Sequence, residues 1–106
     1  MSYIIALVLF LQGLTPTIVA TNKGEDLLIT YQAGAKMACT VFEMQTPENY
    51  APRHCWLVEE DSTNYIDDWH LIPPYDKDWK VYAEVAYQGP DDKPVFLKSN
   101  VLSLHR

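Results

Sequence analysis

Basic residues are scarce in this sequence, and no charged residue precedes Lys23. Eight Lys and Arg residues stand against fourteen Asp and Glu, which gives a net charge of −6 at pH 7. The stretch from Glu59 to Asp92 holds ten acidic residues and only two basic ones, Lys77 and Lys80. A surface of this sign repels nucleic-acid phosphates and anionic lipid headgroups. The charge balance therefore argues against nucleic acid as a partner.

Motifs of reaction chemistry are also missing. The sequence contains no paired-cysteine zinc pattern, no His-Glu-x-x-His, no phosphate-binding loop and no Gly-x-Ser-x-Gly. Its three histidines, His54, His70 and His105, stand far apart, and none has a second ligand at metal spacing. Cys55 directly follows His54, but neighbours on a strand face opposite sides and make no catalytic pair. The sequence predicts no enzyme, no cofactor and no metal site.

Two acidic segments offer the nearest approach to a metal site. Asp67-Asp68 and Asp76-Lys77-Asp78 carry carboxylates of the kind that bind calcium at one rim of a sandwich. Carboxylates on turns are more often simply solvated, and Lys77 sits between two of them. Solvated loops are the preferred interpretation.

A long apolar stripe of helical period is absent after residue 20, whereas alternation of strand period is frequent. The clearest case is residues 79–87, where Trp79, Val81, Ala83, Val85 and Tyr87 fall on one face. A cluster of turn formers at residues 88–94 follows, so that residues 79–104 predict a β-hairpin. Further strands are predicted at residues 27–32, 36–44, 55–58 and 65–72. The fold class is all-β, an antiparallel sandwich of about seven strands over residues 21–106.

The first twenty residues form a separate apolar segment. Residues 3–11 contain no polar side chain apart from a tyrosine hydroxyl, and Ile18-Val19-Ala20 ends the segment before a polar turn. This pattern fits a secretory signal cleaved after Ala20, although no Lys or Arg precedes the apolar run. The alternative is an uncleaved segment, buried or serving as an anchor or assembly contact. The run is short and interrupted for a membrane-spanning helix.

The order of elements resembles that of immunoglobulin-like and fibronectin type III-like sandwiches. A strand with Cys39 precedes a strand with Trp56, a proline-marked corner leads to residues 78–85, and residues 95–104 form a last strand. The phase of apolar residues changes near Ser99-Asn100, which a β-bulge would explain. The resemblance implies that Trp56 is the core tryptophan and that Tyr82 or Trp79 lies near an aromatic corner. It also implies adhesion, recognition or structural decoration.

The cysteines depart from that family. Its inter-sheet disulfide would need a second cysteine within residues 79–87, where Ala83 or Val85 stands instead. Met37, Cys39 and Val41 are predicted to face the core, whereas Cys55 faces away from it if Trp56 faces inward. A Cys39–Cys55 bridge would therefore require Cys55 to lie in the loop before its strand. The alternative is two buried reduced thiols. An even cysteine count suits an oxidising compartment.

Aromatic residues near predicted loops are the best functional indication in the sequence. Tyr50, Tyr65, Tyr75 and Tyr87 are candidates for recognition, because tyrosine is frequent in protein interfaces. The alternative is that they close the ends of a small core.

The sequence thus predicts a non-enzymatic β-sandwich module for binding or adhesion, secreted or on the cell surface, with a protein partner or an oligomeric assembly. Contact with a membrane is expected only through residues 1–20, if they are not cleaved. The alternative function is a structural virion or phage component whose apolar N-terminal segment packs against neighbouring subunits.

Overall fold

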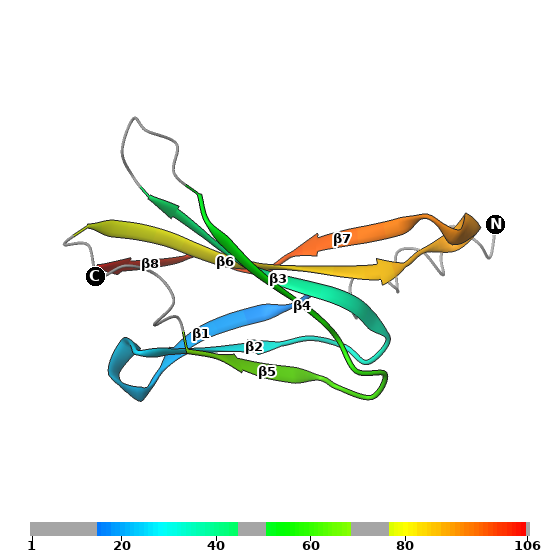
Figure 1. Ribbon diagram of the computed structural model, residues 1–106, viewed down its shortest axis with the longest axis horizontal. Coiled ribbons are helices and arrows are strands. Elements are labelled where there is room, and N and C mark those ends of the chain that lie inside the picture. The colour runs from blue at the N-terminus through cyan, green and yellow to red at the C-terminus, as the bar shows by residue number, and fades with distance from the viewer. Residues whose placement is uncertain (1–14, 45–50, 69–76, 106) are drawn as a thin grey trace.

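The computed structural model describes residues 15–44, 51–68 and 77–105, which form two antiparallel β-sheets packed face to face (Figure 1). The smaller sheet has the order β1-β2-β5, with β1 at Thr17–Thr21, β2 at Asp26–Thr30 and β5 at Asn64–Asp67. The larger sheet has the order β4-β3-β6, and both β7 and β8 pair with the far edge of β6. Its strands are β3 (Ala35–Met44), β4 (Arg53–Leu57), β6 (Asp78–Gln88), β7 (Pro94–Lys98) and β8 (Leu102–His105). Short 3-10 turns are η1 (Asn22–Gly24) and η3 (Pro90–Asp92). The prediction of an all-β fold is confirmed.

Within these residues, no helix reaches the length and apolarity that a membrane crossing requires.

The core is built around the inner face of β6, as the alternation in residues 79–87 predicted. All five inward side chains are at most 3% exposed, and Trp79, Val81, Ala83 and Val85 are completely buried. They pack against the inner face of the smaller sheet, which contributes Ile18, Leu27 and Ile29. Burying one such large apolar side chain stabilises the fold by about 1.5–3 kcal/mol. Trp79 is thus the core tryptophan, whereas Trp56 is half-buried on the edge strand β4.

The face of β3 that points into the core differs from the prediction. Ala38 and Phe42 are the buried core residues, and Met37, Cys39 and Val41 lie on the opposite face. Register explains the reversal, since Ala38 pairs with Val85 and Phe42 with Val81, both on the inner face of β6. Both faces of β3 are apolar, and so its own alternation could not decide the direction.

A bulge separates β7 from β8, in agreement with the predicted change of phase. Lys98 pairs with Glu84 and Leu102 with Val81, so four steps along one strand oppose three along the other. At this point the N–H of Ser99 donates to the carbonyl of Ala83 (2.8 Å), and the Ser99 hydroxyl accepts from the N–H of Ala83 (2.7 Å). The extra residue turns Leu102 and Leu104 toward the core.

Asn100, next to this bulge, joins the larger sheet to β1. Its side-chain oxygen accepts from the N–H of Ile18, and its side-chain nitrogen donates to the carbonyl of Ile18, both at 2.9 Å. Ile18 itself is fully buried. The sequence pattern did not indicate β1, because all but the last of its residues belong to the apolar segment 1–20. The predicted boundary between residues 20 and 21 falls inside this strand, and residues 1–14 lie outside the described residues.

Because β1 is part of the fold, the stability of an N-terminally truncated chain depends on whether the truncation removes β1. A chain that begins at Thr15 keeps β1, whereas a chain that begins at Thr21 loses buried Ile18 and both bonds to Asn100. We expect the shorter chain to be less stable by about 3 kcal/mol or more, as for the loss of a buried isoleucine. Urea unfolding followed by tryptophan fluorescence would measure the difference. Equal unfolding free energies for the two chains would show that β1 contributes nothing to the fold.

Candidate functional site

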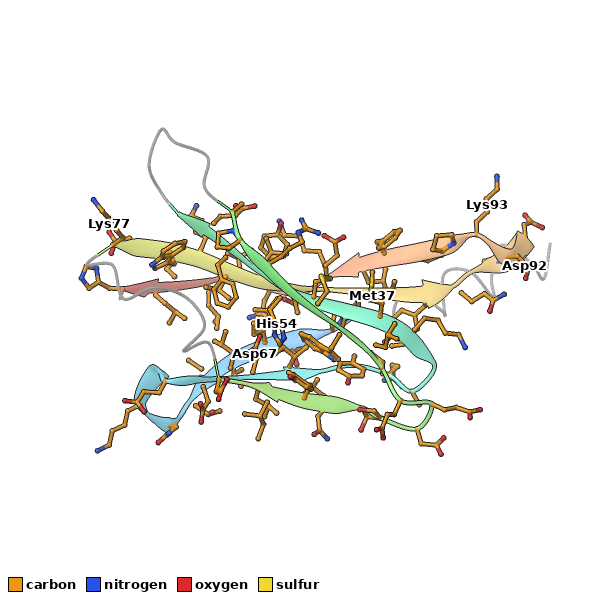
Figure 2. All side chains as sticks on the ribbon, in the orientation of Figure 1. Met37, His54, Asp67, Lys77, Asp92 and Lys93 are labelled. Atoms are coloured by element: carbon orange, nitrogen blue, oxygen red, sulfur yellow. A yellow bond between two sulfur atoms is a disulfide. The ribbon has the colours of Figure 1, made fainter. Side chains whose placement is uncertain are left out.

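His54 and Asp67 form a hydrogen-bonded pair between the two sheets. His54 on β4 and Asp67 on β5 point toward each other (Figure 2), with Nδ1 and Oδ2 separated by 3.1 Å. The Asp67 side chain is 3% exposed and the His54 side chain 35%. An ionised carboxylate only accepts hydrogen bonds, so His54 Nδ1–H donates when Asp67 is ionised. The pair fastens β4 to β5 along one side of the sandwich.

Aromatic rings extend this contact between β4 and β5. The rings of Trp56 and Tyr65 are stacked, with centroids 4.1 Å apart and planes 18° apart. The His54 ring lies 5.6 Å from that of Trp56. Burial raises the pKa of the Tyr65 phenol, and the charge of Asp67 adds to the effect. We call His54, Trp56, Tyr65 and Asp67 the inter-sheet cluster.

The hydroxyl that lies next to the inter-sheet cluster in the β3–β4 ladder is not accessible. Thr40 pairs with His54 across the β3–β4 ladder, which brings a hydroxyl, an imidazole and a carboxylate into one region. Hydrolases use such groups, but their nucleophile must meet the substrate. Thr40 is completely buried, so its hydroxyl is closed to any substrate. The cluster is a structural joint between the sheets.

Two of the acidic residues considered as calcium ligands, Asp67 and Asp78, are paired with histidines. Asp67 is bound by His54, and Asp78 Oδ1 lies 2.7 Å from His105 Nδ1. Asp76 lies outside the described residues. Among those residues, no group of three His, Cys, Asp or Glu side chains gathers as a metal site would require.

Two of the four tyrosines proposed for recognition, Tyr65 and Tyr87, lie among the described residues. Tyr50 and Tyr75 lie outside the described residues, and Tyr65 belongs to the inter-sheet cluster. Tyr87 is 3% exposed, and its hydroxyl donates to the carbonyl of Gln32 and accepts from its N–H, both at 3.0 Å. Its place on the inner face with Trp79 was visible in the alternation of its strand. Tyr87 is therefore a core residue that ties β6 to the segment after β2.

Cys39 and Cys55 form a disulfide in a position that the sequence did not predict. Cys55 lies within β4, directly opposite Cys39 of β3, with their Cα atoms 4.0 Å apart. Both cysteines point away from the core, because their neighbours Ala38 and Trp56 point toward it. The bridge therefore needs no loop. A disulfide across this span contributes about 3 kcal/mol in the chain-entropy account.

The outer face of the larger sheet carries a set of exposed apolar side chains that includes Leu57, the most exposed large apolar residue that the structure describes. Register aligns Leu57 of β4 with Met37 of β3, Met37 with Ala86 of β6, and Ala86 with Phe96 of β7. We call these four residues the apolar row. Leu57 is 83% exposed, Phe96 55% and Met37 37%. An aligned set of exposed apolar side chains is typical of an interaction surface.

A shallow cavity adjoins the apolar row at the β6–β7 end of the sheet. Its volume is about 230 Å3, and its lining includes Lys36, Ala86, Gln88, Asp92 and Pro94. Ala86 belongs to both features, so they are continuous. A side chain of a partner that rests on the row can extend into this hollow.

The outer face carries little of the negative charge of the chain. Cross-strand neighbours Glu43 and Lys80, and Glu84 and Lys98, offset each other there. Arg53 of β4 and Asp78 of β6, which lies opposite His105 of β8, are also on this face, so its cations and anions are about balanced. The ammonium group of Lys98 lies 4.0 Å from the centre of the Tyr82 ring.

Tyr82 of β6 contacts one of these charged side chains, that of Glu43. Its hydroxyl donates to Glu43 Oε1 at 3.1 Å. Burial raises the pKa of the Tyr82 phenol, and the bond to Glu43 raises it further. Tyr82 lies on the outer face of β6 and is 8% exposed.

His54→Ala should destabilise the protein, because it leaves the buried Asp67 carboxylate without its partner. We expect a loss of about 1–3 kcal/mol in the free energy of unfolding. A double-mutant cycle with Asp67→Ala, measured by urea unfolding, would isolate the coupling between the two side chains. His105→Ala is the matched control, because its pair with Asp78 is exposed and should contribute less than about 0.5 kcal/mol. Equal losses for the two histidines would refute the role of the buried pair.

The buried tyrosines predict a loss of stability at alkaline pH. Burial raises the pKa of Tyr87 above its ordinary value, so the folded protein holds this proton more tightly than the unfolded chain. The resulting contribution is complete below about pH 10 and is lost as the pH rises through the higher pKa of the folded state. Urea unfolding across this range should show a steeper decline for the wild type than for Tyr87→Phe. Parallel declines would contradict the assignment.

Comparisons with protein-family models, with curated proteins and with solved structures find no match to this chain. No functional residue is therefore transferred to it from a relative. Contacts, burial and charge identify the outer face of the larger sheet as the candidate site, with the apolar row at its centre.

Proposed function

We propose that this chain is a non-enzymatic β-sandwich module of the immunoglobulin-like or fibronectin type III-like kind, which binds another protein. The observation that carries the proposal is the apolar row on the outer face of the larger sheet. Leu57 and Phe96 stand at its two ends and expose 83% and 55% of their surface. Natural proteins rarely leave aligned apolar side chains on a sheet without a partner.

The strand order supports the resemblance. Immunoglobulin-type sandwiches place the first, second and fifth strands in one sheet and the third, sixth and seventh in the other. Here β1, β2 and β5 form one sheet, and β3, β6 and the β7–β8 segment belong to the other. The fourth strand extends the second sheet beside β3. This order is consistent with a scaffold that serves recognition, since function in such folds comes from exposed surfaces and not from the core.

The chemistry of the outer face indicates its partner. On the strands of this face, the acidic residues Glu43, Asp78 and Glu84 are offset by the basic residues Arg53, Lys80 and Lys98. Another protein therefore meets less repulsion on this face than the net charge of −6 would suggest. We infer a partner with a flat apolar surface, because apolar contact with few unpaired charges is characteristic of interface centres.

The disulfide supports export of the module. Disulfides persist in oxidising compartments and are rare where thiols are kept reduced. Cys55 lies on an edge strand with its side chain exposed, where cellular reductants have access to it. A secreted or surface location follows as part of the proposal.

Site-specific photo-crosslinking in the cells that naturally produce the chain would test this function. A photoreactive phenylalanine derivative in place of Met37 or Phe96 should form a covalent adduct with the same protein from both positions. The matched controls are Val19 and Ile66, which are exposed apolar residues on the smaller sheet. A Phe96→Ser substitution should greatly reduce the adduct formed from position 37. Adducts formed only from positions 19 and 66 would move the binding surface to the other sheet.

A further inference from the structure

Among the described residues, no strand pairs with the outer edge of β4. On its inner edge, the N–H of Phe42 donates to the carbonyl of Pro52 (2.9 Å), and the N–H of Val58 donates to the carbonyl of Lys36 (3.1 Å). Hydrogen-bonded and non-hydrogen-bonded pairs alternate in an antiparallel ladder. His54 and Trp56 therefore bond to β3, whereas Arg53, Cys55 and Leu57 direct their N–H and C=O groups away from the sheet.

These outward backbone groups are unpaired in the part of the chain that the structure describes. Neither the N–H nor the C=O group of Arg53, Cys55 or Leu57 has a hydrogen-bond partner there, and all three side chains are exposed. A row of alternating donors and acceptors at this spacing matches the edge of another β-strand.

Two other edges of the sheets, those of β1 and of β7–β8, carry features that hinder such pairing. On β1, the Asn100 side chain occupies both the N–H and the C=O group of Ile18. The far edge of β6 is covered by β7, which begins with Pro94, and the bulge at Ser99 interrupts its continuation into β8. Proline and bulges are common protections of natural edge strands. β4 has neither at its outward positions.

β4 is also held rigidly before any partner arrives. The disulfide ties Cys55 to β3, the hydrogen bond to Asp67 ties His54 to β5, and the stack ties Trp56 to Tyr65. Little conformational entropy is then lost when a second strand pairs with it.

The side chains of residues 53–59 are complementary to those of a second copy of the same segment. Arg53 and Glu59 lie three positions before and three positions after Trp56. In an antiparallel pair of two such segments centred on Trp56, each Arg53 lies opposite the Glu59 of the other copy. Each Leu57 then lies opposite the exposed Cys55. Neither Arg53 nor Glu59 forms an ion pair with a described residue.

We propose that two copies of this chain associate through β4, antiparallel about Trp56, into a symmetric dimer with one continuous sheet across both molecules. The outward groups of Cys55 and Leu57 exchange hydrogen bonds between copies, and two Arg53–Glu59 pairs set the register. Leu57, the most exposed large apolar side chain of the described residues, becomes covered. The two apolar rows then belong to one extended outer face. The dimer shares Leu57 with the apolar row, whereas its other contacts, the backbone groups of β4 and the two Arg53–Glu59 pairs, lie along the edge of the sheet.

Charge exchange tests both the partner and the register. Sedimentation velocity of the disulfide-bonded full chain, over a wide concentration series, should show a monomer–dimer equilibrium. Arg53→Glu alone and Glu59→Arg alone should each weaken it about tenfold or more, because two attractive pairs become repulsive. An equimolar mixture of these two variants should form a heterodimer, in which every Glu at 53 or 59 faces an Arg. The doubly exchanged chain should again form a homodimer.

Lys98→Glu is the matched control, since it reverses a charge on β7, at the opposite edge of the same sheet, and should leave the dimer unchanged. Amide hydrogen exchange should show protection of Cys55 and Leu57 that increases with protein concentration, whereas His54 and Trp56 are protected throughout. A wild-type chain that stays monomeric at all concentrations would overturn the proposal. Dimers that neither charge variant affects would overturn it as well, because they would use another surface.

Protection of Cys55 and Leu57 that needs an extended segment of a different protein would assign the edge to that partner and would also overturn the dimer. Loss of the dimer with retention of the adduct from position 96 would leave the proposed function intact. Loss of the adduct from position 96 with retention of the dimer would refute the proposed function and leave the dimer proposal intact.

Discussion

The burial of one face of β6 is the constraint on which the rest of this structure depends. Five side chains from Trp79 to Tyr87 enter the core from a single eleven-residue strand. β3 pairs with one side of β6, and β7 and β8 pair with the other, so this burial determines which way each of their side chains points. Through β3 the same constraint reaches β4, and it turns both cysteines outward. The position of the disulfide thus follows from the burial of one face of β6, which is two strands away from β4.

Two polar joints keep the smaller sheet against this core. On one side, the His54–Asp67 pair and the Trp56–Tyr65 stack connect β4 with β5. On the other side, Asn100 binds both backbone groups of Ile18 in β1. Each joint satisfies groups that would be costly to bury alone, namely a carboxylate and the polar edge of a strand. Tyr87 adds a third connection through the backbone of Gln32. Polar contacts of this kind give the two sheets one relative position, which apolar contact alone specifies less strictly.

The features that suggest function are those that this packing leaves unsatisfied. The outer face of the larger sheet retains the apolar row, and the edge of β4 retains three residues with unpaired backbone groups. Both lie on strands fixed by the disulfide and the inter-sheet cluster, so both are preorganised for binding. The dense negative charge of the loops lies elsewhere, which leaves these surfaces close to neutral. The proposed role in protein recognition would account for both features.

Local alternation and turn chemistry were sufficient to determine the all-β class, the inner face of β6, the polar turn after it and the phase change at Ser99-Asn100. In each case one segment carries the whole signal. Only the tertiary structure shows which face of β3 is buried, that residues 17–21 form a strand, and that Cys55 lies within β4. A strand that is apolar on both faces does not specify which face is buried, and only the pairing of Ala38 with Val85 decides it. The contact of His54 with Asp67, the alignment of Leu57 with Met37 and Phe96, and the open edge of β4 likewise depend on strand order and register, because these join residues that are distant in the sequence.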